Sequence, residues 1–373
     1  MRLKKFFGTI HLWLGLITGL VVFIIAITGA IYCFAPEIQK YTQSYTNVEE
    51  KNQAFLSPSR LKDIAEKKLP GKNIARIYYG AKDQSVVVWF SKKEAYDQSV
   101  FVNPYSGEVL KVRNNEKDFI SLVLKIHRTL LIPYGHEIIS WSTVIFVIML
   151  ISGIIIWWPK NKRTAKHGFK VKWNAHPKRL NYDLHKVLGF YVSWIAIFSA
   201  LTGLIFSFKG FAEVTYKLTG VKHSIVQKNP PVSDTSIKSN TEYPVLDKVW
   251  KNFEPELQAR YARIMFVLPM NETGPILVRA NPDLKKLYRS DFRYFDQYSG
   301  NEIDGAYVWG QYKDAKTVAD NLKRMNYDIH TGAILGLPGR IVLFFAALIV
   351  ASLPITGFYF YWGKRKKARR RVR

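Results

Sequence analysis

The sequence predicts an α-helical membrane protein with four transmembrane helices and two small α+β domains outside the membrane, which follow the first and third helices. Three observations lead to this fold class: four long apolar runs, an internal repeat, and an uneven distribution of charge. The apolar runs occupy residues 10–34, 138–158, 186–208 and 335–362. At about 1.5 Å of rise per residue, runs of this length span a bilayer core of about 30 Å.

The first and third apolar runs are copies of one motif. HLWLGLITGLVVFIIAITGAIYCF (11–34) and HKVLGFYVSWIAIFSALTGLIFSF (185–208) align without a gap. With one inserted residue, the segments that lead into the second and fourth runs also align, and His127 then matches His330. The chain is therefore a duplication of one unit, in which a span, an outer domain and a second span follow each other.

The net charge of +27 is concentrated in short segments. Lys and Arg outnumber Asp and Glu by 8 to 1 in residues 159–184 and by 8 to 0 in residues 363–373, but only by 16 to 12 in residues 35–137. Short basic segments that alternate with long, nearly balanced ones are typical of the positive-inside rule. We therefore expect both termini and the 159–184 loop in the cytoplasm, and no nucleic acid as a partner.

The two outer segments repeat one order of elements. In the first, a helix with a serine cap (57–69) precedes strands and the turn Asn-Pro-Tyr-Ser-Gly (103–107). In the second, a helical stretch (245–253) precedes strands and the turn Asp-Gln-Tyr-Ser-Gly (296–300). Each outer domain is thus expected to be a small helix packed on an antiparallel sheet. The strands are expected at 74–79, 86–90, 100–102, 109–110, 261–267, 276–280 and 293–295.

These boundaries divide the chain into eight segments. They are a first transmembrane helix (1–35), a first outer domain (36–125), a second transmembrane helix with its lead-in (126–160), a basic cytoplasmic loop (161–180), a third transmembrane helix (181–208), a second outer domain (209–328), a fourth transmembrane helix (329–363) and a basic cytoplasmic tail (364–373).

Four histidines occupy equivalent places in the duplication. Spans one and three start in the cytoplasm, so His11 and His185 are expected at one depth near the inner side. Spans two and four start outside, so His127 and His330 are expected together near the outer side. Two histidines at matched depth can supply both axial nitrogens of one b-type haem, which predicts two haems and four iron ligands. His136 has no histidine counterpart and is a second choice for the outer ligand.

Small residues continue the face that each inner histidine begins, starting with Gly15 after His11 and Gly189 after His185. Such residues allow a flat macrocycle to approach the helix. Small residues at this spacing are equally typical of contacts between membrane helices, and both interpretations stay open. The single cysteine, Cys33, excludes a disulfide framework and the C-x-x-C-H motif of covalently attached haem.

Several of these motifs together resemble the PepSY-associated transmembrane family. They are the paired H-x-x-L-G openings, Ile126-His127-Arg128, Ile329-His330-Thr331-Gly332 and the paired [Asn/Asp]-x-Tyr-Ser-Gly turns. The resemblance implies a multi-pass protein of the bacterial inner membrane with PepSY-like periplasmic domains. It also implies two b-type haems and the reduction of a ferric siderophore outside the cytoplasm.

Other features limit the choice of electron donor. No G-x-G-x-x-G motif follows a predicted strand, no P-loop is present, and the cytoplasmic segments are too short for a flavin or nicotinamide domain. A quinol or a separate cytosolic protein is therefore the expected donor. Two alternatives to a reductase remain: a non-redox binding or regulatory protein that acts through its outer domains, and a transporter built from repeats.

Overall fold

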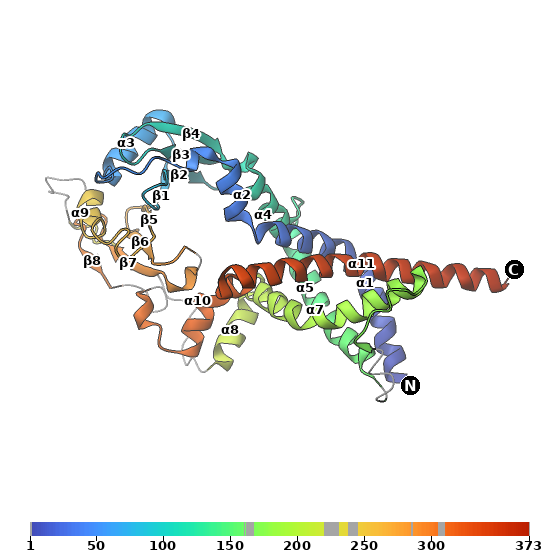
Figure 1. The fold of residues 1–373 in the computed structure, drawn as a ribbon. Coiled ribbons are helices and arrows are strands. Elements are labelled where there is room, and N and C mark those ends of the chain that lie inside the picture. The colour runs from blue at the N-terminus through green and yellow to red at the C-terminus, as the bar shows by residue number, and fades with distance from the viewer. Residues whose placement is uncertain are drawn as a thin grey trace. The chain divides into compact units, whose positions relative to one another are not determined.

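The computed structural model describes residues 2–159, 161, 168–219, 231–237, 245–284, 286–304 and 310–372 (Figure 1). These residues form two compact units. The first, which we call the bundle, contains residues 1–35, 123–212 and 326–373. The second, which we call the sheet unit, contains residues 36–122 and 213–325. Each unit draws on both halves of the duplication.

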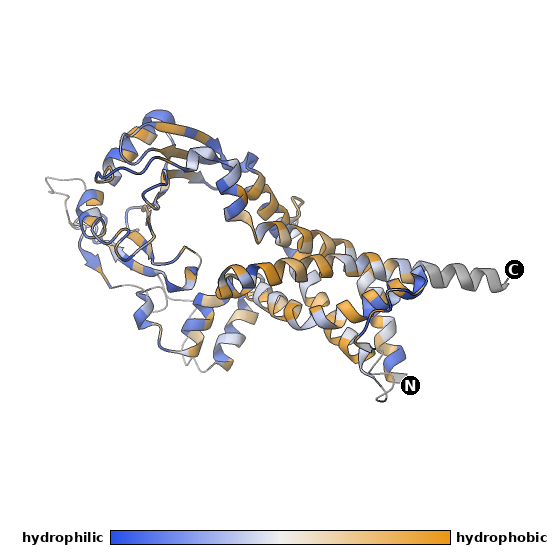
Figure 2. Ribbon diagram, in the orientation of Figure 1, coloured by the Kyte–Doolittle hydropathy of each residue, from blue (hydrophilic) through white to orange (hydrophobic). Residues whose placement is uncertain are grey.

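The bundle is built from four long helices. They are α1 (Arg2–Tyr32), α5 (Gly135–Trp157), α7 (Pro177–Ser207) and α11 (Gly336–Val372). Each includes a stretch long and apolar enough to cross a membrane, and Figure 2 shows the hydrophobic residues that run along them. The prediction of four membrane helices is confirmed, and a lipid bilayer is the environment that these helices require.

The four helices form a closed ring. Both α1 and α7 pack against α5 and α11. Neighbouring helices run antiparallel, because His11 near the start of α1 contacts Gly153 near the end of α5. The inner face of the ring carries a cluster of small and aliphatic side chains, which allow the helices to approach closely. They are Val22, Ala26, Leu150, Val192, Ala196, Ala346, Val350 and Ala351.

Two short helices lead into α5 and α11. These are α4 (Phe119–Thr129) and α10 (Val318–His330). The turn after each is tight, and a glycine makes it possible. A Cβ on Gly135 would lie 1.7 Å from the Thr129 carbonyl oxygen, and a Cβ on Gly339 would lie 2.2 Å from that of Gly332. No other residue fits at these positions without moving the backbone, so the turns fix α4 and α10 against the spans that follow.

The sheet unit contains one antiparallel sheet of eight strands in the order β4-β3-β2-β1-β5-β6-β7-β8. The strands are β1 (Ile74–Tyr79), β2 (Val86–Lys92), β3 (Tyr96–Val102), β4 (Val109–Asn114), β5 (Arg263–Val267), β6 (Ile276–Asn281), β7 (Asp291–Phe295) and β8 (Glu302–Ile303). The sequence led us to expect two separate outer domains. Instead β1 pairs with β5, from Arg76 opposite Val267 to Tyr79 opposite Ile264, and joins both halves into one sheet.

The core of the sheet unit lies between one face of the sheet and helices α3 (Pro58–Lys68) and α9 (Val245–Lys251). Tyr79 of β1 stacks on Trp250 with ring centres 4.1 Å apart, so the core is shared between the halves. Two further helices, α2 (Ala35–Thr42) and α8 (Lys209–Leu218), follow α1 and α7.

The start of α3 differs from the serine cap that the sequence predicts. The Ser57 hydroxyl makes no capping bond to its own helix and donates to the Asp247 carboxylate at 3.0 Å. Asp247 also accepts a hydrogen bond from the backbone N–H of Ser59 at 3.0 Å. A carboxylate from α9 therefore accepts from a backbone N–H in the first turn of α3, as the side chain of a capping serine would otherwise do.

Candidate functional site

The inner histidines meet inside the bundle. His11 lies on α1 and His185 on α7, the two helices that face each other across the ring. Their imidazole centres are 6.4 Å apart and the ring planes are at 89°. The sequence places these residues at equal depth, and the structure brings their side chains together.

The outer histidines meet in the same way. His127 at the end of α4 and His330 at the end of α10 have ring centres 6.3 Å apart, with the planes at 63°. His136 sits at the start of α5, where it is exposed and lines the cavity beside this pair. The geometry favours His127 over His136 as the partner of His330.

A hydroxyl and a glycine hold each inner imidazole. His11 Nδ1 lies 3.0 Å from Ser152 Oγ, and His185 Nδ1 lies 2.9 Å from Thr356 Oγ1. The glycine after each hydroxyl leaves room for the ring: a Cβ on Gly153 would lie 3.4 Å from His11 Cε1. Ser152 and Thr356 are equivalent in the duplication, so the two contacts are copies of each other.

The outer imidazoles are held by the other two helices. Thr28 Oγ1 lies 3.1 Å from His127 Nδ1, and Thr202 Oγ1 lies 3.1 Å from His330 Nδ1. Glycine follows again in both cases, with a Cβ on Gly29 3.2 Å from His127 Cε1. Each of the four spans therefore carries one Ser-Gly or Thr-Gly dipeptide that holds one histidine.

These contacts decide which ring nitrogen carries the proton. His127 Nδ1 lies 3.0 Å from the Ile25 carbonyl oxygen, which can only accept, so Nδ1 must be the donor. The Ser152 hydroxyl donates its proton to the Met149 carbonyl and Thr356 donates to its own helix, so these oxygens accept from the inner histidines. With the proton on Nδ1, the lone pair of Nε2 is available to bind a metal ion.

The sequence alignment contained the Ser-Gly and Thr-Gly dipeptides, but their role was missed. Residues 28–29 match 202–203, and Gly153 matches Gly357, yet sequence analysis assigned no function to them. The signal was a hydroxyl residue followed by glycine at matching positions of the repeat, Thr28-Gly29 with Thr202-Gly203 and Ser152-Gly153 with Thr356-Gly357. The contact to a histidine on a different helix could not be read from the alignment.

Gly15 and Gly189 have a different environment. A Cβ on Gly15 would lie 3.1 Å from Met149 Cε, and a Cβ on Gly189 would lie 3.6 Å from Leu353 Cδ2. In the described structure both glycines thus lie at contacts with the neighbouring helix. This corresponds to the interpretation of the small residues as a helix–helix contact.

The histidine pairs fit a haem iron bound between two imidazoles. A metal ion is bound by an imidazole nitrogen at about 2.0 Å, and with about 1.2 Å from nitrogen to ring centre, two rings on opposite sides of one ion have centres roughly 6.4 Å apart. The observed distances are 6.4 and 6.3 Å. Across the described residues, no group of three or more His, Cys, Asp or Glu side chains could hold a bare metal ion.

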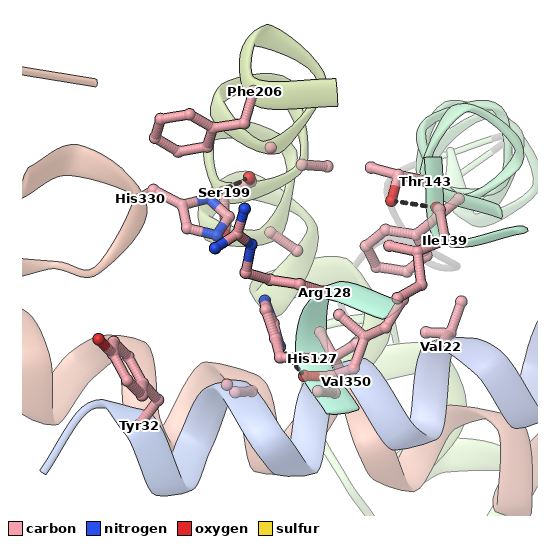
Figure 3. A pocket seen from close by; sticks show the side chains of 18 of the residues that line it. Val22, Tyr32, His127, Arg128, Ile139, Thr143, Ser199, Phe206, His330 and Val350 are labelled. Atoms are coloured by element: carbon pink, nitrogen blue, oxygen red, sulfur yellow. Dashed lines mark hydrogen bonds between the residues drawn. The ribbon is translucent and has the colours of Figure 1, made fainter. Parts of the chain in front are cut away.

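The outer pair lines a cavity of about 530 Å³ (Figure 3). All four spans contribute to its wall, for example through Val22, Ile139, Phe206 and Val350. A mostly apolar cavity of this size with a few polar groups is typical of a site for a small organic ligand or cofactor. The cavity therefore fits a flat apolar group held between His127 and His330.

The two pairs lie far apart along the bundle. His127 contacts α1 at residues 28 and 29. The distance along a helix axis from residue 11 to residue 28 is about 26 Å. The small and aliphatic side chains of the bundle core lie between them. The arrangement thus offers two similar binding sites, one at each end of an apolar layer.

Comparison with curated proteins finds no match. The sequence model for the PepSY-associated TM region, by contrast, matches residues 9–364, which covers both halves of the duplication and all four spans. The chain therefore belongs to the PepSY-associated transmembrane family and is a multi-pass membrane protein.

Proposed function

We propose that this protein is a di-haem b-type reductase of the bacterial inner membrane, which passes electrons across the membrane to a ferric siderophore in the periplasm. Reduction would release ferrous iron for uptake. The observation that carries the proposal is the pair of histidine sites, with ring centres 6.4 and 6.3 Å apart. Both distances fit an iron ion bound between two imidazoles.

The residues assigned to the cofactors are His11 with His185 on the inner side and His127 with His330 on the outer side. A haem held by two histidines supplies reversible one-electron exchange. The protein contributes the orientation of each ring through Ser152, Thr356, Thr28 and Thr202. Its apolar core excludes water and ions from the layer between the two sites.

The proposed topology places both termini in the cytoplasm and the sheet unit in the periplasm, with PepSY-like domains. Its support is the excess of basic residues in the short segments and the antiparallel order of the four helices. The inner site would then receive electrons from a quinol or from a separate cytosolic protein. The sheet unit would bind the ferric chelate.

Reduction is a useful way to release iron from such a chelate. Siderophores bind ferric iron through hard oxygen ligands, and the ferrous ion has a lower charge and suits these ligands less well. An electron delivered outside the cytoplasm thus weakens the complex without breaking the ligand.

The test begins with an absorbance spectrum of the protein purified in detergent. The haem-loaded protein is then reduced chemically, freed of reductant, and mixed under anaerobic conditions with ferric hydroxamate or ferric catecholate chelates. We expect rapid reoxidation of the haem and capture of ferrous iron by a chelator. A colourless protein, or haem that stays reduced with every chelate, would favour a non-redox binding or regulatory role through the sheet unit.

A further inference from the structure

The outer cavity carries a positive charge at one point of its wall. Its lining residues include no Asp or Glu, and Arg128 is the permanently charged side chain among them. Figure 3 shows Arg128 in the cavity together with the imidazoles of His127 and His330. Arg128 follows His127 directly in α4, and both side chains line the cavity.

No carboxylate of the described residues forms an ion pair with Arg128. Elsewhere in the bundle, Arg179 pairs with the buried Asp183 at 3.0 Å. Arg128 is exposed in the described structure and lies at the wall of a mostly apolar cavity, so its guanidinium is accessible to an anionic group of a ligand in the cavity. The missing partner can be supplied by a ligand.

The duplication contains no second cation at the equivalent position. Thr331 follows His330 as Arg128 follows His127, and Thr331 also lines the cavity. The two histidines are therefore related by the repeat, whereas the charge beside them is not. The second half of the repeat keeps the contact between its histidine and a span threonine with Thr331 in place of the arginine, so that contact does not need a cation at this position.

We propose that Arg128 binds a carboxylate of the cavity ligand, and that this carboxylate is a propionate of the outer haem. The proposal rests on the proposed function. A haem has a wide apolar surface and two carboxylates at one edge, which matches a cavity that is apolar over most of its wall and cationic at one point. A guanidinium binds a carboxylate through two parallel N–H donors, and the bond strengthens where water is excluded.

The test combines Arg128→Met with haem whose propionates are blocked as methyl esters. Wild type and variant are each reconstituted with haem and with haem dimethyl ester, and haem loss to apomyoglobin is timed. With haem, we expect the outer site of Arg128→Met to lose its cofactor roughly tenfold faster or more. With the dimethyl ester, we expect the two proteins to behave alike, because the group that Arg128 binds is gone.

Two further variants and a second readout complete the test. Arg60→Met, the same substitution at an exposed arginine of α3 that does not line the cavity, should leave the rate of haem loss unchanged, and Arg128→Lys should recover part of the lost affinity. Removing a cation beside the iron favours the ferric state, so the midpoint potential of the outer haem should fall in Arg128→Met. The inner haem of the same molecule should keep its potential, which shows that the variant is folded.

The outcomes separate this inference from the proposed function. Wild-type protein that binds no haem, or that holds a fatty acid in the cavity instead, overturns both. Wild-type protein with two haems and an Arg128→Met variant that matches Arg60→Met in potential and haem loss overturns the role of Arg128 alone.

Discussion

His185 donates its Nδ1 proton to Thr356 Oγ1 over 2.9 Å, from α7 to α11. The hydroxyl is itself anchored, because it donates to the Ser352 carbonyl of its own helix at 3.0 Å. The direction of the imidazole is therefore set by a neighbouring helix and not by the helix that carries it.

This contact leads to the first prediction. Thr356→Val keeps the shape of the side chain but removes the acceptor for His185 Nδ1. Partners of this kind typically contribute about 10- to 100-fold to metal affinity, so we expect the inner haem to be lost faster by a factor in that range. Thr9→Val is the matched control, since Thr9 donates to its own helix at Lys5 and holds no histidine. Equal haem retention in both variants would contradict the role of the hydroxyl.

The second prediction concerns the ligands themselves. His185→Ala should remove about half of the haem measured as pyridine haemochrome, since each haem needs both of its imidazoles. The outer site should keep its spectrum. His176→Ala is the control, because His176 caps the start of α7 and lies in neither histidine pair. A variant without His11, His127, His185 and His330 that still binds two haems would refute the assignment.

A third prediction tests the glycine beneath each ring. In Gly29→Ala, the new Cβ would lie 3.2 Å from His127 Cε1, so the imidazole must move by a few tenths of an ångström. We expect a shifted electron paramagnetic resonance spectrum for the outer haem and an unchanged one for the inner haem. Gly210→Ala places its Cβ where no heavy atom lies within 4 Å, and it should change neither signal.

The fourth prediction concerns the contact between the two halves of the sheet unit. Asp247→Ala removes the carboxylate that accepts from Ser57 and from the Ser59 backbone. Loss of a helix cap costs about 1 kcal/mol, so amide hydrogens in the first turn of α3 should exchange roughly fivefold faster. Asp63→Ala, on the exposed side of the same helix, should leave this exchange unchanged. Equal exchange rates in the two variants would mean that the cap contributes nothing.

The proposed topology can be tested by labelling in intact cells. In a protein with Cys33 replaced by alanine, Ser91→Cys in β2 and Ser236→Cys should react with a thiol reagent that cannot cross the inner membrane. Lys178→Cys, at the start of α7, should react only after the membrane is opened. Labelling of Lys178→Cys in intact cells would invert the proposed orientation.

Much of the fold could be predicted because it depends on local patterns. The spans follow from the length of the apolar runs, and β1 was expected at Ile74–Tyr79, where the structure has it. The joining of β1 to β5 could not be predicted, because strand pairing depends on edges that come together only in the folded protein. The same reason explains why Asp247 was not recognised as the cap of α3.

For the candidate site, the sequence predicted which histidines pair but not what holds them. The duplication and the direction of the spans place His11 near His185 without any knowledge of helix packing. Ser152 holds His11 because α5 is a neighbour of α1 in the ring. The order of the helices around the ring cannot be read from the sequence of any single segment. The cation at Arg128 was visible in the sequence, but its place in the cavity was not.

The pairing of β1 with β5 has a consequence for the origin of the molecule. Each half of the chain contributes four strands, and the strand at the junction is β1 in the first half and β5 in the second. A half on its own would leave this strand as an unpaired edge of its sheet. A half-length ancestor would have covered this edge with the same edge of a second copy, in a twofold symmetric dimer. Such a dimer would have carried both histidine pairs, with one histidine of each pair from each subunit.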